Sequence, residues 1–327
     1  MATIVLVHGI AQEQRSADSL EAEWLPDLAG GIRNAGHPAL ADRIWRSGLP
    51  GAEITARMAF YGHRFLRPGA QGATGDDLTP SEEAAAEEVA WELLYNAADS
   101  TQPQDSGEAD LELRALTRGP QGEQGVRAAA GRVISAIDRI SWLTQAGLYL
   151  SGRINKALRQ IVQYLTDEAT REYALQQVRQ LLTFETRIVI GHSLGSVVAY
   201  EVVHELPSGQ HLPLLVTLGS PLGLSSVNHR LRYPPSYPPA VARWVNLADR
   251  NDVVAARPNL HTVFDNTRPP GTQFDSTYTP DNGAQPHRAG FYLTKKGCGQ
   301  PVAENCPGTV GLANENTPPR RGSRSPG

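Results

Sequence analysis

Short runs of apolar residues, many of them β-branched, recur along this chain. They occupy residues 4–7, 54–60, 188–190, 214–218 and 241–247, and most of them end at glycine, histidine or a polar turn. Continuous apolar runs of this length are typical of strands that are buried on both faces of a parallel sheet. The pattern therefore predicts an α/β protein with a mostly parallel sheet that is flanked by helices.

The long stretch between the second and third of these runs has a different pattern. Residues 67–80 and 99–125 are rich in Gly, Pro and acidic residues, as loops are, whereas apolar residues recur at helical spacing over 126–182. Residues 80–83, Pro-Ser-Glu-Glu, are typical of a helix start with an acidic first turn. A crossover between parallel strands needs a single helix, so we expect 67–182 to form a helical insertion that lies as a lid over the candidate serine, Ser193.

The expected lid carries apolar side chains, among them Leu148 and Leu150, which we take as candidate substrate-binding residues. On one interpretation they line a pocket for an acyl chain or rest on a membrane surface. On the other they pack against the sheet as core. The interpretations differ in outcome, because aspartate at these positions would penalise long-chain substrates selectively in the first case and lower stability in the second.

The remaining residues divide into a core and a tail. Residues 1–66 and 183–296 carry all the predicted strands, so we expect them to form the sheet-bearing core. Residues 297–327 have few apolar side chains and many Gly and Pro. That composition indicates a loosely structured C-terminal tail.

The chemistry of the chain is concentrated around Ser193. Residues 191–195, Gly-His-Ser-Leu-Gly, follow the apolar run 188–190 directly, and 194–206 then carry apolar residues at helical spacing. A G-x-S-x-G segment in this strand-turn-helix context is typical of a nucleophile elbow, where a strained turn makes the serine hydroxyl project outward. Gly191 and Gly195 would let the strand and the helix approach each other closely. Ser193 is therefore the candidate nucleophile.

Several segments together resemble the α/β-hydrolase superfamily, and within it the lipases and esterases. They are Val-His-Gly-Ile at 7–10, the elbow at 191–195, Gly-Ser-Pro-Leu-Gly at 219–223, the segment Trp-Val-Asn-Leu-Ala-Asp-Arg-Asn-Asp-Val-Val at 244–254, and the His-x-x-x-x-Tyr spacing at 287–292. The resemblance implies the α/β-hydrolase fold and a serine-based hydrolytic activity. It does not specify the substrate.

The resemblance covers roughly the first 60 residues and those from about 183 to 293. It includes a second serine next to an apolar run, Ser220, which lacks the second glycine of an elbow. We interpret Ser220 as a structural turn residue.

In this superfamily the catalytic acid follows a later strand than the nucleophile. The run 241–247 is followed by two aspartates, Asp249 and Asp252. Asp252 precedes Val253-Val254-Ala255, which would hold its carboxylate against apolar side chains, whereas Asp249 resembles a turn former or a cap. We expect Asp252 to be the acid and keep Asp249 as the alternative.

The resemblance places the general base on a loop near the end of the sheet. Two histidines follow Asp252 in the chain, His261 and His287. His261 comes only nine positions after Asp252, within an alternating segment, 260–264, that is typical of a short strand. His287 follows a Pro- and Gly-rich stretch that is long enough to bring its imidazole over Ser193, so we expect His287 to be the base.

The first strand ends in His8-Gly9-Ile10, the position from which these hydrolases take one amide of the oxyanion hole. The second amide comes from the residue after the nucleophile, here Leu194. We therefore expect the N–H groups of Ile10 and Leu194 to bind the oxyanion. His8 is expected to orient the loop.

These assignments imply a serine hydrolase that cleaves small-molecule or lipid carboxylic esters through an acyl-enzyme, with no cofactor and no metal. Thioesters, amides and acyl transfer remain open, because the same residues serve all of them. Two further alternatives are a hydrolase effector that a protein partner activates and, from a different class, a non-catalytic binding protein of the same fold.

Composition and net charge narrow the classes of partner and metal that we expect the chain to bind. The chain has 327 residues, 40% of them hydrophobic, with a net charge of −4 and a pI near 6.1, which argues against a nucleic-acid partner. No segment has the spacing of a zinc-ligand cluster.

Cys298 and Cys306 could pair only in an oxidising compartment. No signal-peptide pattern precedes the first strand and no apolar run is long enough to span a bilayer, so we expect a cytoplasmic protein, with contact to a membrane surface through the lid as an open possibility.

Overall fold

The computed structural model describes residues 2–45, 54–66, 79–101, 103–117, 153–255, 257–277 and 280–307. Within them, six strands form one sheet in the order β2-β1-β3-β4-β5-β6, and every neighbouring pair is parallel. The strands are β1 (Ile4–Val7), β2 (Ala56–Ala59), β3 (Ile188–His192), β4 (Leu212–Leu218), β5 (Val241–Leu247) and β6 (Gln273–Asp275). The predicted α/β class with a parallel sheet is confirmed; β6, which is short and partly exposed, is an addition to the predicted strands.

Side chains alternate between the two faces of the sheet, and each face has its own core. In β1, Val5 and Val7 point into one hydrophobic cluster while Ile4 and Leu6 point into the other. Because successive side chains of a strand point in opposite directions, a strand with both sets buried must be covered on both sides. The continuous apolar runs of the sequence follow from this requirement.

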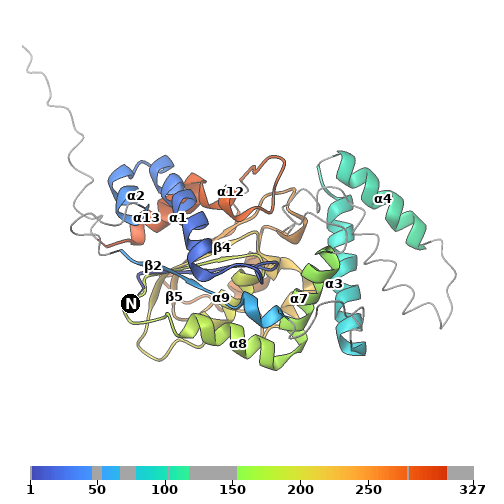
Figure 1. The fold of residues 1–327 in the computed structure, drawn as a ribbon, viewed down its shortest axis with the longest axis horizontal. Coiled ribbons are helices and arrows are strands. Elements are labelled where there is room, and N and C mark those ends of the chain that lie inside the picture. Colours follow the sequence, from blue (N-terminus) through green and yellow to red (C-terminus); the bar gives the residue numbers. More distant parts are fainter. Residues whose placement is uncertain are drawn as a thin grey trace, which may run out of the picture.

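Among the described residues, helices from both ends of the chain cover the face that holds Ile4 and Leu6, and Figure 1 shows them together on one side of the sheet. They are α1 (Ala17–Asn34), α2 (Pro38–Trp45), α12 (Ala289–Leu293) and α13 (Lys296–Asn305). Helices from the two ends of the chain are thus neighbours, since α1 packs against both α12 and α13.

The opposite face is covered by helices from the middle of the chain, as Figure 1 shows for α7, α8 and α9. They are α3 (Pro80–Ala98), α7 (Arg153–Thr166), α8 (Glu168–Arg179) and α9 (Leu194–His204), with α4 (Pro103–Thr117) packed on α3. The short helices α10 (Ser225–Asn228) and α11 (His261–Phe264) lie in the loops after β4 and β5. The predicted helix start at Pro80 is confirmed, because Thr79 caps α3 in a reciprocal arrangement with Glu82.

Part of the expected insertion therefore belongs to the core of this face. Val89 of α3, Leu158 of α7 and Leu175 of α8 are buried in the same cluster as Val5 and Val7 of the sheet. Leu148 and Leu150 lie outside the described residues, so their role in substrate binding and the lid as a whole stay predictions.

The expected loose tail from residue 297 is wrong for its first part, since Lys296–Asn305 form helix α13. Cys298 and Val302 are fully buried there, and a Cβ added at Gly299 would lie 2.0 Å from the carbonyl oxygen of Gly31 in α1. Several buried residues of this helix, among them Cys298, Gly299 and Ala303, are small, and small residues let two helix backbones approach closely. The thiols of Cys298 and Cys306 are both buried, and burial raises the pKa of each to about 12.

The close contact between α13 and α1 predicts a large effect of a single methyl group. We expect Gly299→Ala to lower the free energy of unfolding by about 1–3 kcal/mol, because the added Cβ overlaps the backbone of Gly31. Gly107→Ala in α4 is the matched control, because nothing lies within 4 Å of its added Cβ and alanine favours a helix by about 0.5–1 kcal/mol over glycine. Urea unfolding of both variants checks this; equal stability of the two would contradict the docking of α13.

Candidate active site

The candidate residues lie where β1, β3 and β5 end, at the carboxyl edge of the sheet. The strands β1 and β3 are neighbours in the sheet, but the chain leaves β1 toward β2 on one side and leaves β3 toward β4 on the other. Such a switch in strand order opens a crevice at the carboxyl ends of the two strands, and ligands of open α/β sheets bind there. Ser193, after β3, and His8-Gly9-Ile10, after β1, lie on the two sides of this switch point.

Ser193 occupies a strained turn between β3 and α9. Its φ of 54° and ψ of −130° lie outside the regions that non-glycine residues usually adopt. Such a conformation costs on the order of 1–3 kcal/mol and persists only where the surroundings enforce it. Here the Ser193 N–H donates to the carbonyl oxygen of Leu218 in β4 (3.0 Å), which fixes the start of the turn. The predicted strand-turn-helix around Ser193 is confirmed.

Three glycines allow the backbones around this turn to meet. A Cβ added at Gly191 would lie 2.5 Å from the carbonyl oxygen of Gly195, and one at Gly195 would lie 2.3 Å from that of His8. A Cβ at Gly9 would lie 2.7 Å from the Cβ of Ser193. All three contacts are shorter than side chains tolerate, so the glycines at these positions are a packing requirement.

Ser196 holds the carbonyl group of the strained residue, and Ser220 contacts Ser196 in turn. Ser196 Oγ lies 2.5 Å from the Ser193 carbonyl oxygen and 2.6 Å from Ser220 Oγ, and all three serines are buried. Ser220 also accepts a hydrogen bond from the N–H of Leu222 (3.3 Å). Ser220 is thus a turn residue, as the sequence predicts, and it supports the elbow through Ser196.

The structure brings Ser193, His287 and Asp252 into one hydrogen-bonded line. The distance from Ser193 Oγ to His287 Nε2 is 3.0 Å, and His287 Nδ1 lies 2.9 and 2.8 Å from the two carboxylate oxygens of Asp252. A carboxylate accepts, so Nδ1 carries the proton and Nε2 is free to accept the hydroxyl proton of Ser193. All three side chains are buried.

Asp252 is held ionised by its partners. Burial alone would raise the pKa of this carboxyl, but the charge and hydrogen bond of His287 and the hydroxyl of Tyr292 outweigh it, so that the pKa lies below its ordinary value. Tyr292 Oη donates to Asp252 Oδ2 (2.7 Å), and the N–H of Val254 donates to Oδ1 (3.1 Å). Asp252 therefore has the contacts that a histidine-orienting acid needs.

The two alternatives occupy other places. Asp249 accepts hydrogen bonds from the N–H groups of Asn251 and Asn282, and so connects the turn after β5 to the loop that carries His287. His261 begins helix α11, where a strand was expected, and its ring packs on Phe274 (4.5 Å between centroids) with Nδ1 3.4 Å from Asp265. The strand expectation at 260–264 is wrong because His261 and Phe264 here follow a helical turn.

The N–H groups of Ile10 and Leu194 have no hydrogen-bond acceptor among the described residues. Leu194 is the first residue of α9, so its amide is one of those that a helix cannot satisfy internally, and the helix dipole adds partial positive charge there. Both groups are thus available to an anionic oxygen, as the sequence predicts. Their role as an oxyanion hole stays a prediction.

His8 supports the loop that carries Ile10. The Tyr61 N–H donates to His8 Nε2 (3.2 Å), so Nδ1 carries the proton and donates to the carbonyl oxygen of Gly9 (2.7 Å). Tyr61 stacks on the ring at 4.2 Å and its hydroxyl donates to the His8 carbonyl. Burial lowers the pKa of His8 to about 4, so the ring is neutral at physiological pH.

Ala11, which follows Ile10, has a positive φ of 59°, and a side chain of α7 holds it in this conformation. The Ala11 N–H donates to Gln160 Oε1 (2.8 Å), and Gln160 Nε2 donates to Glu13 Oε2 (2.9 Å). Gln160 is 2% exposed. Sequence reasoning did not find this contact, because it joins positions 149 residues apart and glutamine has no chemical signature of its own.

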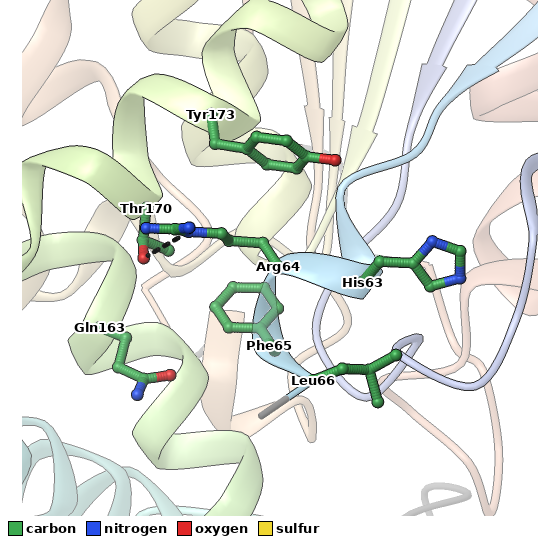
Figure 2. A pocket seen from close by; sticks show the side chains of 7 residues that line it. All are labelled: His63, Arg64, Phe65, Leu66, Gln163, Thr170 and Tyr173. Atoms are coloured by element: carbon green, nitrogen blue, oxygen red, sulfur yellow. Dashed lines mark hydrogen bonds between the residues drawn. The ribbon is translucent and has the colours of Figure 1, made fainter. Parts of the chain in front are cut away.

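A groove of about 440 Å³ lies beside this loop, between η1 (Gly62–Phe65) and helices α7 and α8. Its lining consists of His63, Arg64, Phe65, Leu66, Gln163, Thr170 and Tyr173 (Figure 2). Figure 2 shows Arg64 extended toward Thr170, whose hydroxyl accepts a hydrogen bond from Arg64 Nε (3.3 Å). The groove adjoins the Ile10 loop, since a Cβ at Gly62 would lie 2.7 Å from the carbonyl oxygen of Gln12.

In the part of the chain that the structure describes, no three His, Cys, Asp or Glu side chains gather as metal ligands would. Among the helices described, none has the length and apolar character needed to cross a bilayer. No protein-family model, curated protein or solved structure matches this chain.

The lowered pKa of Asp252 predicts how stability depends on pH. Unfolded aspartate titrates at about 3.9, so the stabilisation by the ionised carboxylate is present above about pH 4 and is lost as the pH falls through the lower folded pKa. We expect the difference in unfolding free energy between the wild type and Asp252→Asn to be largest near neutral pH and to shrink below about pH 4.

Urea unfolding between about pH 7 and pH 3 measures this difference, with Asp110→Asn as the control because Asp110 is exposed on α4. The control difference should stay within about 0.5 kcal/mol at every pH. A difference for Asp252→Asn that does not change with pH would mean that the pKa of Asp252 is the same in the folded and unfolded protein, and a difference that grows as the pH falls below about 4 would mean that folding raises this pKa.

Proposed function

We propose that this chain is a serine hydrolase of the α/β-hydrolase fold that cleaves carboxylic esters through an acyl-enzyme. The observation that carries the proposal is the line Ser193–His287–Asp252, with 3.0 Å between nucleophile and base and at most 2.9 Å between base and acid. This line ends at a strained serine beside two amides that are free to bind an anion. A nucleophile, an oriented base and an oxyanion site in mutual reach are the parts that acyl transfer requires.

In the proposed first half-reaction, His287 Nε2 removes the Ser193 hydroxyl proton while Oγ attacks the ester carbonyl carbon. The carbonyl π electrons move to oxygen, and the N–H groups of Ile10 and Leu194 stabilise the resulting oxyanion. His287 is then an imidazolium that Asp252 stabilises. As the tetrahedral intermediate collapses, the C–O bond to the alcohol breaks and His287 gives its proton to the leaving alkoxide.

The second half-reaction repeats these steps with water. His287 removes a proton from water, the hydroxide oxygen attacks the acyl carbon, and collapse breaks the bond to Ser193 Oγ, which recovers its proton from His287. The free acid leaves. Thioester cleavage and acyl transfer to a second alcohol would use the same residues. Substrate assays are therefore needed to identify the leaving group and the acyl acceptor.

The burial of the site favours an opening step before catalysis. Ser193 is 1% exposed and His287 is 8% exposed, so an ester carbonyl reaches Oγ only after the groups that cover it move. This observation supports the alternative of a hydrolase that a partner or an interface activates. The non-catalytic alternative would have no use for the strain at Ser193, which costs stability without improving packing.

A fluorophosphonate probe tests the proposal directly. We expect the probe to label the wild type at Ser193, and Ser193→Ala to lose the label while it keeps the wild-type melting temperature or exceeds it, since the strain is at the backbone. Ser193→Ala and His287→Ala should each lower kcat on p-nitrophenyl esters by several orders of magnitude, and the double variant should lose little more, because the residues act as a unit.

An ester series from acetate to palmitate then defines the acyl site. Labelling that appears only with detergent micelles or a protein partner would support the activated form. The absence of Ser193-dependent labelling under all of these conditions would refute hydrolysis and favour the binding protein.

The roles of the two aspartates predict a difference between two matched variants. We expect Asp252→Asn to lower kcat about 10⁴-fold, because the amide favours the wrong tautomer of His287. Asp249→Asn should lower kcat less than about tenfold, because its remaining carbonyl oxygen still accepts one of the hydrogen bonds that order the loop. Steady-state kinetics on one ester decides the matter, and the reverse ranking would transfer the catalytic role to Asp249.

A further inference from the structure

His192, the residue before the nucleophile, contacts the main chain of the base. Its Nε2 lies 2.8 Å from the carbonyl oxygen of His287. A carbonyl oxygen can only accept, so Nε2 carries the proton and donates it. The described residues supply no other hydrogen bond to this carbonyl. The contact therefore joins the elbow directly to the loop that carries the base.

The surroundings of His192 fix the orientation of its ring. Trp24 of α1 meets it edge-on at 6.1 Å, and the rings of Tyr292 and His287 lie 6.2 and 4.8 Å away. The residue is 8% exposed, and burial lowers its pKa to about 3, with a further contribution from the nearby His287. A neutral ring in a fixed plane presents the same donor at every pH at which an esterase works.

The loop that carries His287 has few other attachments near the imidazole. Upstream, Asn282 donates through its N–H to Asp249 and through Nδ2 to the carbonyl oxygen of Pro286 (2.9 Å). Downstream, helix α12 begins at Ala289. Between them, the main chain of His287 itself is held by His192.

We propose that His192 is a positioning residue that sets the distance between nucleophile and base by holding the His287 carbonyl through its Nε2–H. This inference rests on the proposed function of Ser193 and His287. Because His192 and Ser193 are adjacent at the end of β3, the path from the nucleophile to the base consists of one peptide unit and one hydrogen bond. Displacement of a catalytic group by about 1 Å can cost about 10²-fold in rate, so the loss of this hydrogen bond should slow the chemical step.

Two substitutions separate positioning from packing. His192→Met keeps the volume but removes the donor, and we expect kcat to fall about 10- to 100-fold with KM unchanged. His192→Gln keeps a neutral N–H donor at similar reach, and should recover most of the wild-type kcat. The control is His204→Met at the end of α9, because His204 is paired with Tyr200 and Ser236 and does not contact His287. This control should lower the melting temperature without lowering kcat.

A purely structural role for His192 gives a different result. His192→Met and His192→Gln would then lose kcat equally, or kcat would fall in His204→Met as far as in His192→Met at the same loss of melting temperature. Either result overturns the proposal.

Proton NMR makes the test independent of catalytic turnover. The His287 Nδ1 proton, bonded to Asp252, should give a downfield resonance that Asp252→Ala removes. We expect this resonance to exchange faster with water in His192→Met and to return to wild-type exchange in His192→Gln. An unchanged resonance in His192→Met overturns the positioning role even if esters are cleaved. The expected change in a protein that cleaves no ester supports the positioning of His287 and refutes only the hydrolase proposal.

Discussion

The close approach of three backbones at the carboxyl edge of the sheet is the constraint on which the site depends. The end of β1, the end of β3 and the start of α9 meet at distances that exclude any side chain at Gly9, Gly191 and Gly195. Ser193 adopts its strained conformation at this contact, where its Oγ lies beside Gly9, the residue before Ile10. The strain persists because the strands on both sides of it are buried in two continuous cores, whose burial outweighs a cost of about 1–3 kcal/mol.

The helices between β2 and β3 attach to both loops that flank this contact. Gln160 of α7 accepts a hydrogen bond from Ala11 next to the Ile10 amide, and Asn96 of α3 donates to the carbonyl oxygen of Val253 in the turn that holds Asp252 (3.1 Å). A displacement of either helix would therefore also move the loop at Ile10 or the turn at Asp252. The long connection is therefore part of the support of the site as well as a cover for the sheet.

Local patterns were enough to predict the sheet and Ser193, because buried parallel strands need continuous apolar runs and an elbow needs two glycines around the serine. Asp252 and His287 were expected from the chain order that the resemblance implies. Contacts between distant segments were not predictable in this way. Helix α13 was not predicted, because a segment rich in glycine with few large apolar residues is typical of a loop. The segment is buried at Cys298, Gly299 and Val302 because α1 packs against it, and this contact cannot be read from the local sequence. The contact of His192 was not predicted, because its partner is a backbone carbonyl group 95 residues away. Every residue has such a group, so no sequence pattern identifies the partner.

The charges of the site are few, and burial determines which groups carry them. Burial lowers the pKa of His8 to about 4 and that of His192 to about 3, so both rings are neutral. Asp252 stays ionised because the groups that contact it lower its pKa. A proton taken from Ser193 by His287 would therefore create a cation that faces one carboxylate and two uncharged rings. The low polarity around this pair strengthens its attraction. The carboxylate of Asp252, which contacts His287 directly, would stabilise the imidazolium, and a second positive charge at position 8 or 192 would oppose it.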